Sequence, residues 1–152
     1  MSWTAQACRL RKGRYGEFGR IYAITTVVKN RKPIFNDFGL SRLLINELRR
    51  THVEGLVNSL AWVVMPDHFH WLIELQKSPL SIVMQRTKSR SARAINAACA
   101  SSAQCWQAGY HDRAIRYDDD LQSIARYIVA NPLRAGLVKR LGDYPHWDAI
   151  WL

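Results

Sequence analysis

VNSLAWVVM (57–65), PD (66–67) and HFHWLIEL (68–75) form the stretch of sequence from which the fold is predicted. Both long runs are apolar and rich in β-branched and aromatic residues, which favour strands. Gly55 and Pro66 bound the first run, and the dipeptide Pro66-Asp67 is typical of a tight turn. The stretch therefore predicts two neighbouring strands that pair as an antiparallel hairpin.

The segments on either side of this hairpin alternate between strand and helix patterns. β-Branched and aromatic residues predict a strand over 20–28, and leucines at helical spacing predict an amphipathic helix over 38–50. The remaining predicted elements are a helix over 80–100, a short strand over 113–117, a helix that starts at the acidic run 118–120 and ends at or just before Asn131, and a C-terminal tail over 139–152 that packs back on the body.

This order of elements predicts an α+β fold. Strand, helix, strand, strand, helix and strand in succession are typical of a ferredoxin-like or RRM-like sandwich with a central antiparallel sheet. A chain of 152 residues is long enough to bury the core of one domain without disulfide or metal. We therefore expect a single domain over 1–152, in which 1–19 form a basic N-terminal arm.

The composition limits the class of protein. The apolar fraction is 48% and the net charge is +10, so the chain is globular and its expected partner is a polyanion. No apolar run is long enough to span a bilayer, and the N-terminus lacks the plan of a signal peptide. Three cysteines without a Cys-x-x-Cys pair indicate neither a disulfide framework nor a zinc knuckle. We expect a cytoplasmic protein without a membrane partner.

The positive charge is concentrated in the first third of the chain. Residues 1–50 hold 11 Lys and Arg against three acidic residues, and residues 51–152 hold 11 against nine. A second basic group falls at positions i, i+4 and i+7 of a predicted helix and forms one stripe. Either group alone is as consistent with a solvated surface, but together they favour phosphate binding. The predicted DNA-binding residues are Arg9, Arg11, Lys12, Arg14, Arg86, Arg90 and Arg93.

His68 and His70 are the first candidates for chemistry. Side chains alternate along a strand, so the two histidines share one face while Phe69 points the other way. Two imidazoles on one face can reach a single divalent ion. The spacing alone is weak, because paired histidines in a strand are more often structural. Glu74 has the same parity and is either an outer ligand or a solvated carboxylate at the strand end.

Tyr127 and Asn131 are the second pair. Four residues apart on a helix, the phenol and the amide would lie on the same face. An amide oxygen suits Mg²⁺ or Mn²⁺, and the phenol would then lie near a phosphate held by that ion. In isolation the pattern is more often a packed tyrosine with a helix-ending asparagine beside Pro132.

The two patterns occur together and in a specific order. MPDHFHWL (65–72) is followed by CWQ (105–107), DRAIR (112–116) and YIVANPLRAGLV (127–138). In combination these motifs strongly resemble the IS200-like tyrosine transposases, which belong to the His-hydrophobic-His single-strand endonucleases, and they are most similar to the branch associated with repetitive extragenic palindromes (REPs). The resemblance covers about residues 21–147. Two departures are Asp67, where Asn is commoner, and Val129-Ala130 in place of a His-Leu pair.

The resemblance implies roles for individual residues. Tyr127, on a helix in the C-terminal half, would attack single-stranded or hairpin DNA and form a covalent 5′-phosphotyrosine. His68, His70 and Asn131 would hold the divalent metal, Mg²⁺ or Mn²⁺. The implied activity is that of a DNA transposase that cleaves and rejoins hairpin-flanked DNA at REP-type elements.

Two other functions remain open from the sequence. One is a catalytically silent nucleic-acid-binding module with the same fold, and the other is a metal-dependent hydrolase of a small phosphoester. Arg126 and Arg134 flank the predicted nucleophile, where they would either touch phosphate or be solvated. The sequence leaves undecided whether the protein is a monomer or a homodimer, and whether the tyrosine completes the site of its own chain.

Overall fold

The structure is a computed structural model that describes residues 19–116 and 119–151. The four basic residues Arg9, Arg11, Lys12 and Arg14 of the predicted arm lie outside the described residues. Within those ranges, no helix is long and apolar enough to cross a membrane.

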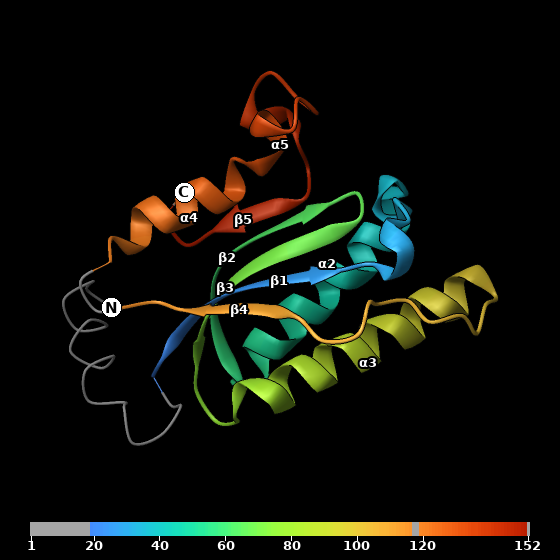
Figure 1. Cartoon of the computed structure of the whole chain (residues 1–152), viewed down its shortest axis with the longest axis horizontal. Coiled ribbons are helices and arrows are strands. Elements are labelled where there is room, and N and C mark those ends of the chain that lie inside the picture. The colour runs from blue at the N-terminus through green and yellow to red at the C-terminus, as the bar shows by residue number, and fades with distance from the viewer. Residues whose placement is uncertain (1–18, 117–118, 152) are drawn as a thin grey trace.

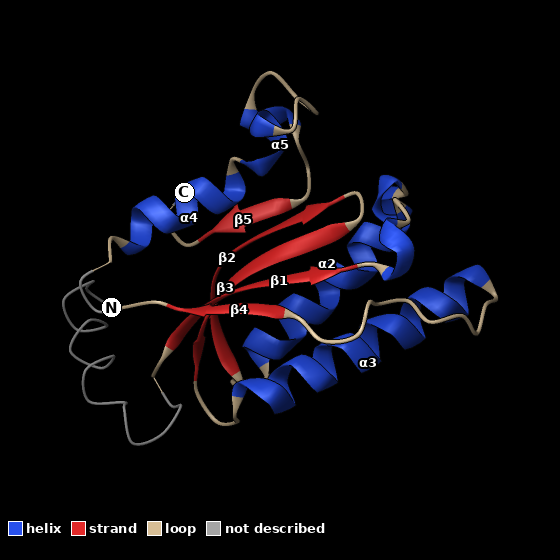
Figure 2. Ribbon diagram, viewed as in Figure 1, coloured by secondary structure: helices blue, strands red, loops and turns tan. Residues whose placement is uncertain are grey.

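Five antiparallel strands form one sheet in the order β4-β1-β3-β2-β5. Figure 2 shows the strands running side by side through the middle of the molecule. The first four have the connectivity predicted for a ferredoxin-like sandwich, so the predicted fold class is confirmed. The strands are β1 (Ile21–Val27), β2 (Val57–Met65), β3 (His68–Leu75), β4 (His111–Ala114) and β5 (Trp147–Ala149).

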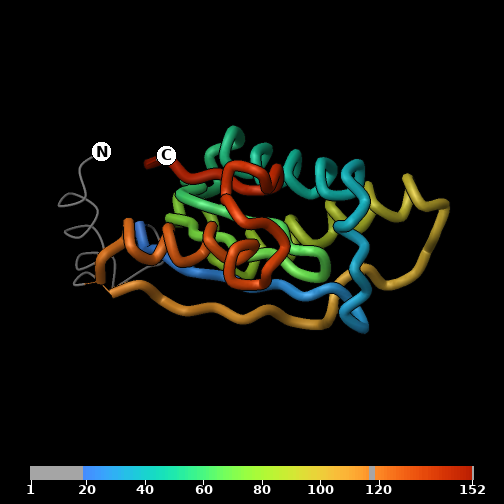
Figure 3. Tube along the Cα trace, turned by 90° about the horizontal axis from the view of Figure 1, so that it is seen from above, coloured from blue at the N-terminus to red at the C-terminus, as the bar shows by residue number. Residues whose placement is uncertain are grey.

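Helices cover both faces of this sheet. The long helices α2 (Phe38–Val53) and α3 (Leu80–Cys99) pack side by side on one face (Figure 1). Helix α4 (Leu121–Val129) packs on the other face, against β2 and β3, and the short helix α5 (Asn131–Arg134) follows it directly. Figure 1 shows α4 above the sheet and α2 below it, and in Figure 3, which is seen from above, α4 lies in front of the strands.

Alternation along β3 divides the core into two clusters. Phe69, Trp71 and Ile73 are fully buried under α2 and α3. Leu72 lies on the opposite face, in the cluster that α4 covers. His68 and His70 have the parity of Leu72, so they lie on the same face of the sheet as α4.

Local capping interactions determine where two helices begin. The carboxylate of Asp37 accepts a hydrogen bond from the Leu40 amide, 3.1 Å away, and α2 starts at the next residue after Asp37. Asp120 accepts in the same way from the Ser123 amide at 3.2 Å. Asp119 and Asp120 therefore precede α4, with Asp120 as its cap, and are not part of its first turn.

In the second half of the chain, one prediction needs correction, and the packing predicted for the tail is confirmed and includes a strand. The strand expected over 113–117 is β4, His111–Ala114, because Thr25 of β1 pairs with His111 and sets an earlier register. Part of the tail forms β5, which pairs with β2 and extends the sheet. Three residues are too few for a period-two pattern to be read, so the sequence predicted packing of the tail but no strand.

We predict that Phe69→Ala lowers the free energy of unfolding by about 3–5 kcal/mol, because it opens a cavity beneath both histidines. The Phe69 side chain is fully buried, with its ring centroid 5.4 Å from that of Trp106. Chemical denaturation measures the loss. Val53→Ala, at a residue 82% exposed, is the matched truncation and should change stability by less than about 0.5 kcal/mol. Equal effects of the two variants would contradict the core position of Phe69.

Candidate active site

The paired histidines lie near the start of β3, on the sheet face that α4 covers. Their ring centroids are 4.9 Å apart and the rings are nearly perpendicular. The fully buried Phe69 between them anchors the strand to the opposite core. The hairpin therefore presents two imidazoles from one rigid strand, as the spacing predicts.

Each histidine ring is oriented through its Nδ1 atom. Nδ1 of His70 lies 2.8 Å from the hydroxyl of Thr25, which faces it across the β1–β3 pair. Nδ1 of His68 lies 2.6 Å from a carboxylate oxygen of Asp67. A ring whose Nδ1–H donates to such a partner presents Nε2 as its ligand atom, which is the usual arrangement of metal-binding histidines.

Asp67 is itself held in place by Arg31. The guanidinium of Arg31 lies 3.1 Å from the second carboxylate oxygen of Asp67, and the Val28 amide donates to the Asp67 carbonyl at 2.9 Å. Burial alone would raise the pKa of Asp67, but hydrogen bonds from His68 and Arg31 lower it below its usual value. The residue that departs from the family pattern is thus an ionised carboxylate directly bonded to His68.

His70 is uncharged at neutral pH. Burial is the largest of the causes that together lower its pKa to about 4, and charge interactions with His68 and Arg134 act in the same direction. A neutral imidazole is the form that binds a metal ion.

Tyr127 lies on the exposed side of α4. The helix buries Leu121, Ala125 and Ile128 against the sheet, while the Tyr127 side chain is 66% exposed. The guanidinium of Arg134 stacks over its ring, with the Arg134 Cζ atom 3.7 Å from the ring centroid. Arg134 thus contacts the predicted nucleophile, and its charge acts on His70.

The geometry expected for Asn131 is only partly correct. Tyr127 and Asn131 do not share one helix, because α4 ends at Val129 and Asn131 is the first residue of α5. The side-chain amide of Asn131 donates to the Ile128 carbonyl at 2.7 Å. This bond uses Nδ2 and leaves Oδ1 as the atom suited to a hard cation.

Two imidazoles and an amide oxygen are donor types that suit a divalent ion with few protein ligands. In the part of the chain that the structure describes, no three His, Cys, Asp or Glu side chains gather into a metal site.

Glu74 is fully buried, with a carboxylate oxygen that accepts hydrogen bonds from Asn58 at 2.8 Å and from Gln76 at 3.1 Å. It is neither solvated nor near the histidines, so both sequence interpretations of Glu74 are wrong.

The other tyrosines are poorer nucleophile candidates. The hydroxyl of Tyr144 donates to the Val64 carbonyl, and burial raises its pKa to about 12. Tyr22 is buried in β1, under the face that α2 and α3 cover. Tyr110 packs against the same core, and Tyr15 and Tyr117 lie outside the described residues.

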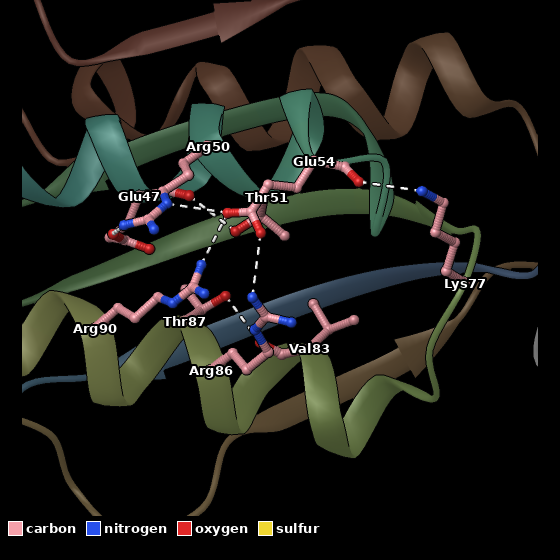
Figure 4. Close-up of polar contacts among 9 residues, drawn as sticks. All are labelled: Glu47, Arg50, Thr51, Glu54, Lys77, Val83, Arg86, Thr87 and Arg90. Carbon is pink, nitrogen blue, oxygen red and sulfur yellow. Dashed lines mark hydrogen bonds and ion pairs between the residues drawn. The ribbon is translucent and has the colours of Figure 1, made fainter.

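The predicted basic stripe on α3 lies on the opposite face of the sheet from the histidines. Glu54, which caps α2, binds Arg90 at 2.8 Å and Arg86 at 3.1 Å (Figure 4). Arg50 binds the same carboxylate at 3.0 Å. These contacts join α2 to α3, so Arg86 and Arg90 have a structural role in the domain. Arg93 is exposed further along α3.

Sequence reasoning missed the residues that orient the histidines. Thr25 and His70 are far apart in the sequence, and only the β1–β3 register places them opposite each other. Arg31 reaches Asp67 from a turn in which its own backbone φ is 51°. The signal available in the sequence was the unusual Asp67, a carboxylate directly before a predicted ligand.

The chain is similar to one known family and to several proteins of that family. The model of the family "Transposase IS200 like" matches residues 18–131. A Haemophilus influenzae protein assigned to the REP-associated tyrosine transposases is 26% identical over 84% of this chain and 78% of its own length. The REP-associated tyrosine transposase of Escherichia coli is 31% identical over 56% of this chain and 50% of its own length.

Two solved structures are also similar to this chain. A REP-associated tyrosine transposase bound to a REP hairpin has a TM-score of 0.72 and 25% identity, and the alignment covers 88% of this chain and 79% of that one. A transposase-like protein of Deinococcus radiodurans shares the fold, with a TM-score of 0.53 and 21% identity over 71% of this chain and 87% of its own.

A ferredoxin-like sheet with paired histidines and a tyrosine-bearing helix on one face places this chain among the tyrosine transposases. More narrowly, the chain belongs to the IS200-like transposase family, because the family model covers most of its length. The resemblance seen in the sequence is therefore confirmed.

We predict that Glu54→Gln lowers the melting temperature at neutral pH, because it removes the carboxylate that Arg50, Arg86 and Arg90 share. The hydrogen bond from Arg90 and the charges of all three arginines lower the pKa of Glu54. A lowered folded-state pKa stabilises the protein above the unfolded pKa, and this contribution is lost as the pH falls through the folded value.

Thermal melts of wild type and Glu54→Gln should therefore converge as the solution is acidified below that folded-state pKa. Asp143→Asn is the control, because Asp143 forms only an exposed pair with Arg140 at 3.4 Å. A constant difference between wild type and Glu54→Gln at every pH would contradict the ionic origin of the effect.

Proposed function

We propose that this protein cleaves and rejoins single-stranded DNA beside a hairpin, with Tyr127 as the nucleophile. The observation that carries the proposal is the arrangement of one sheet face. Two histidines whose Nδ1 atoms are engaged lie on the face against which the tyrosine-bearing helix packs. Membership of the IS200-like family supports DNA strand cleavage and transfer by this arrangement.

The proposed reaction conserves the phosphoester. The Tyr127 hydroxyl oxygen bonds to the scissile phosphorus, the bond from phosphorus to the 3′ oxygen breaks, and the phenolic proton passes to solvent. The departing 3′ oxygen takes up a proton and becomes a free 3′-hydroxyl. The 5′-phosphotyrosine can then be attacked by another 3′-hydroxyl, which restores the phosphodiester and the phenol without an energy source.

The proposed cofactor is Mg²⁺ or Mn²⁺, held by Nε2 of His68 and His70 with Oδ1 of Asn131. A divalent cation bound there would stabilise negative charge on the phosphate oxygens. The chain's own residues orient the ligands: Thr25 and Asp67 contact the Nδ1 atoms and would accept their protons in the metal-binding tautomer, and the Ile128 carbonyl accepts from the Asn131 amide. Burial of His70 keeps its ring neutral and ready to bind.

The proposed substrate is a REP-type hairpin with flanking single strand. The most informative relatives are REP-associated transposases, and one solved relative is bound to a REP hairpin. A net charge of +10 suits a DNA backbone. The arm residues Arg9, Arg11, Lys12 and Arg14 remain predicted phosphate contacts. Arg93 keeps that role on an exposed surface, whereas Arg86 and Arg90 are engaged with Glu54.

We predict that Tyr127→Phe abolishes the covalent adduct while DNA affinity changes less than about threefold, because the exposed ring leaves the fold unchanged. The measurement incubates a 5′-labelled and a 3′-labelled REP hairpin oligonucleotide with protein and Mn²⁺, followed by a denaturing gel. Only label on the 3′ side of the cut should remain attached to protein.

Tyr110→Phe is the matched control and should keep the adduct. An adduct formed by Tyr127→Phe would identify a different nucleophile. Binding without cleavage by the wild type would favour the silent binding module, and cleavage without an adduct would favour a metal-dependent hydrolase.

We predict that Thr25→Val weakens Mn²⁺ binding about 10–100-fold, since it removes the oxygen that orients His70. Calorimetric titration of the DNA-free protein measures the affinity independently of cleavage. Thr26→Val is the matched control, because its side chain is fully buried on the opposite face of β1. Unchanged affinity in Thr25→Val would show that Thr25 does not support a metal ligand.

A further inference from the structure

We propose that Arg134 is a catalytic residue that binds a non-bridging oxygen of the scissile phosphate while its guanidinium holds the ring of Tyr127. The inference rests on the proposed function, because it assigns a phosphate-binding group to the same site. It adds to the candidate site a positively charged group in direct contact with the tyrosine.

The contact between Arg134 and Tyr127 is the first observation. Arg134 Cζ lies 3.7 Å from the centroid of the Tyr127 ring, which is the distance of face-to-face stacking. A guanidinium stacked by its face keeps the N–H donors on its edge for other partners. Those edge donors match two oxygens of a phosphate group.

The break between α4 and α5 brings Arg134 into contact with the Tyr127 ring. On one continuous helix, a residue seven positions after Tyr127 would lie about 10 Å further along the axis. Instead, α4 ends at Val129, and the amides of Leu133 and Arg134 both donate to the Ala130 carbonyl, at 3.0 and 3.1 Å. Pro132 stands in the first turn of α5 and fits the new start.

The charge of Arg134 is not neutralised by the domain. Arg31, Arg50, Arg86, Arg90, Arg113 and Arg140 each contact a carboxylate. Within residues 19–116 and 119–151, no ion pair or hydrogen bond engages the exposed Arg134 guanidinium, whose described contact is the Tyr127 ring. A cation that stacks on the nucleophile is placed where an incoming phosphate needs charge compensation.

The chemical role follows from the charge of the transition state. As the bond from Tyr127 to phosphorus forms and the bond to the 3′ oxygen breaks, negative charge builds up on the non-bridging oxygens. Arg134 donates hydrogen bonds to one of these oxygens and keeps its own proton. Preorganised donors of this kind contribute about 10²–10³-fold in rate.

Arg126 provides a matched control. It precedes Tyr127 on α4, is exposed, and carries the same charge. Arg126→Gln and Arg134→Gln therefore lower the net charge equally. Long-range electrostatic attraction of DNA should weaken equally in both variants. A difference between their rates of adduct formation therefore reports the local contact of Arg134.

The experiment measures single-turnover adduct formation with saturating REP hairpin oligonucleotide and Mn²⁺. We expect Arg134→Gln to lower the rate about 100–1,000-fold, Arg134→Lys to recover part of it, and Arg126→Gln to remain within about threefold of wild type. Melting temperatures verify that each variant is folded. If Arg134→Gln does not fold, the rate of Arg134→Lys is compared with that of wild type instead.

A second substrate separates catalysis from a structural effect. A methylphosphonate at the scissile position removes one charged non-bridging oxygen. One stereoisomer should slow the wild type strongly and slow Arg134→Gln by a much smaller factor, since the partner of that oxygen is already lost. Equal slowing of both proteins by both stereoisomers, or equal rates in Arg126→Gln and Arg134→Gln, would overturn the inference. Failure of the wild type to form any adduct would instead overturn the proposed function.

Discussion

The pairing of β1 with β3 is the constraint on which the candidate site depends. This register places Thr25 opposite His70 and leaves β3 buried between two neighbouring strands. Because side chains alternate, the same strand anchors Phe69 and Trp71 in one core and presents His68 and His70 on the other face. A slip of one residue would exchange the two sets, so the stability of the core and the geometry of the histidines depend on one register.

The C-terminal part of the chain completes the site because α4 packs on the sheet and because a break separates α4 from α5. Helix α4 buries one stripe against β2 and β3 of its own chain, and β5 closes the outer edge of β2. The helix break at Ala130 then separates the roles of neighbouring residues. Asn131 bonds back to Ile128, whereas Arg134 stacks on Tyr127. A single straight helix would satisfy the sequence pattern but not both contacts.

Basic residues in this protein serve different purposes that net charge does not distinguish. Arg86 and Arg90 join two helices through Glu54, and Arg31 fixes Asp67 beside His68. Arg134 contacts an aromatic ring and no described carboxylate. Helical spacing grouped Arg86, Arg90 and Arg93 correctly as a stripe. It could not reveal Glu54, because this partner comes from another helix far away in the sequence.

The sequence by itself determined the fold class, the hairpin with its paired histidines, and the family, because period-two alternation and local motifs are encoded in neighbouring residues. The boundaries of β4 and the existence of strand β5 depended on pairing partners elsewhere in the chain. Only the tertiary structure showed that Thr25 contacts His70, that Arg31 pairs with Asp67 and that Arg134 stacks on Tyr127. Contacts of this kind follow from strand register and helix packing, which bring together residues that no local pattern connects.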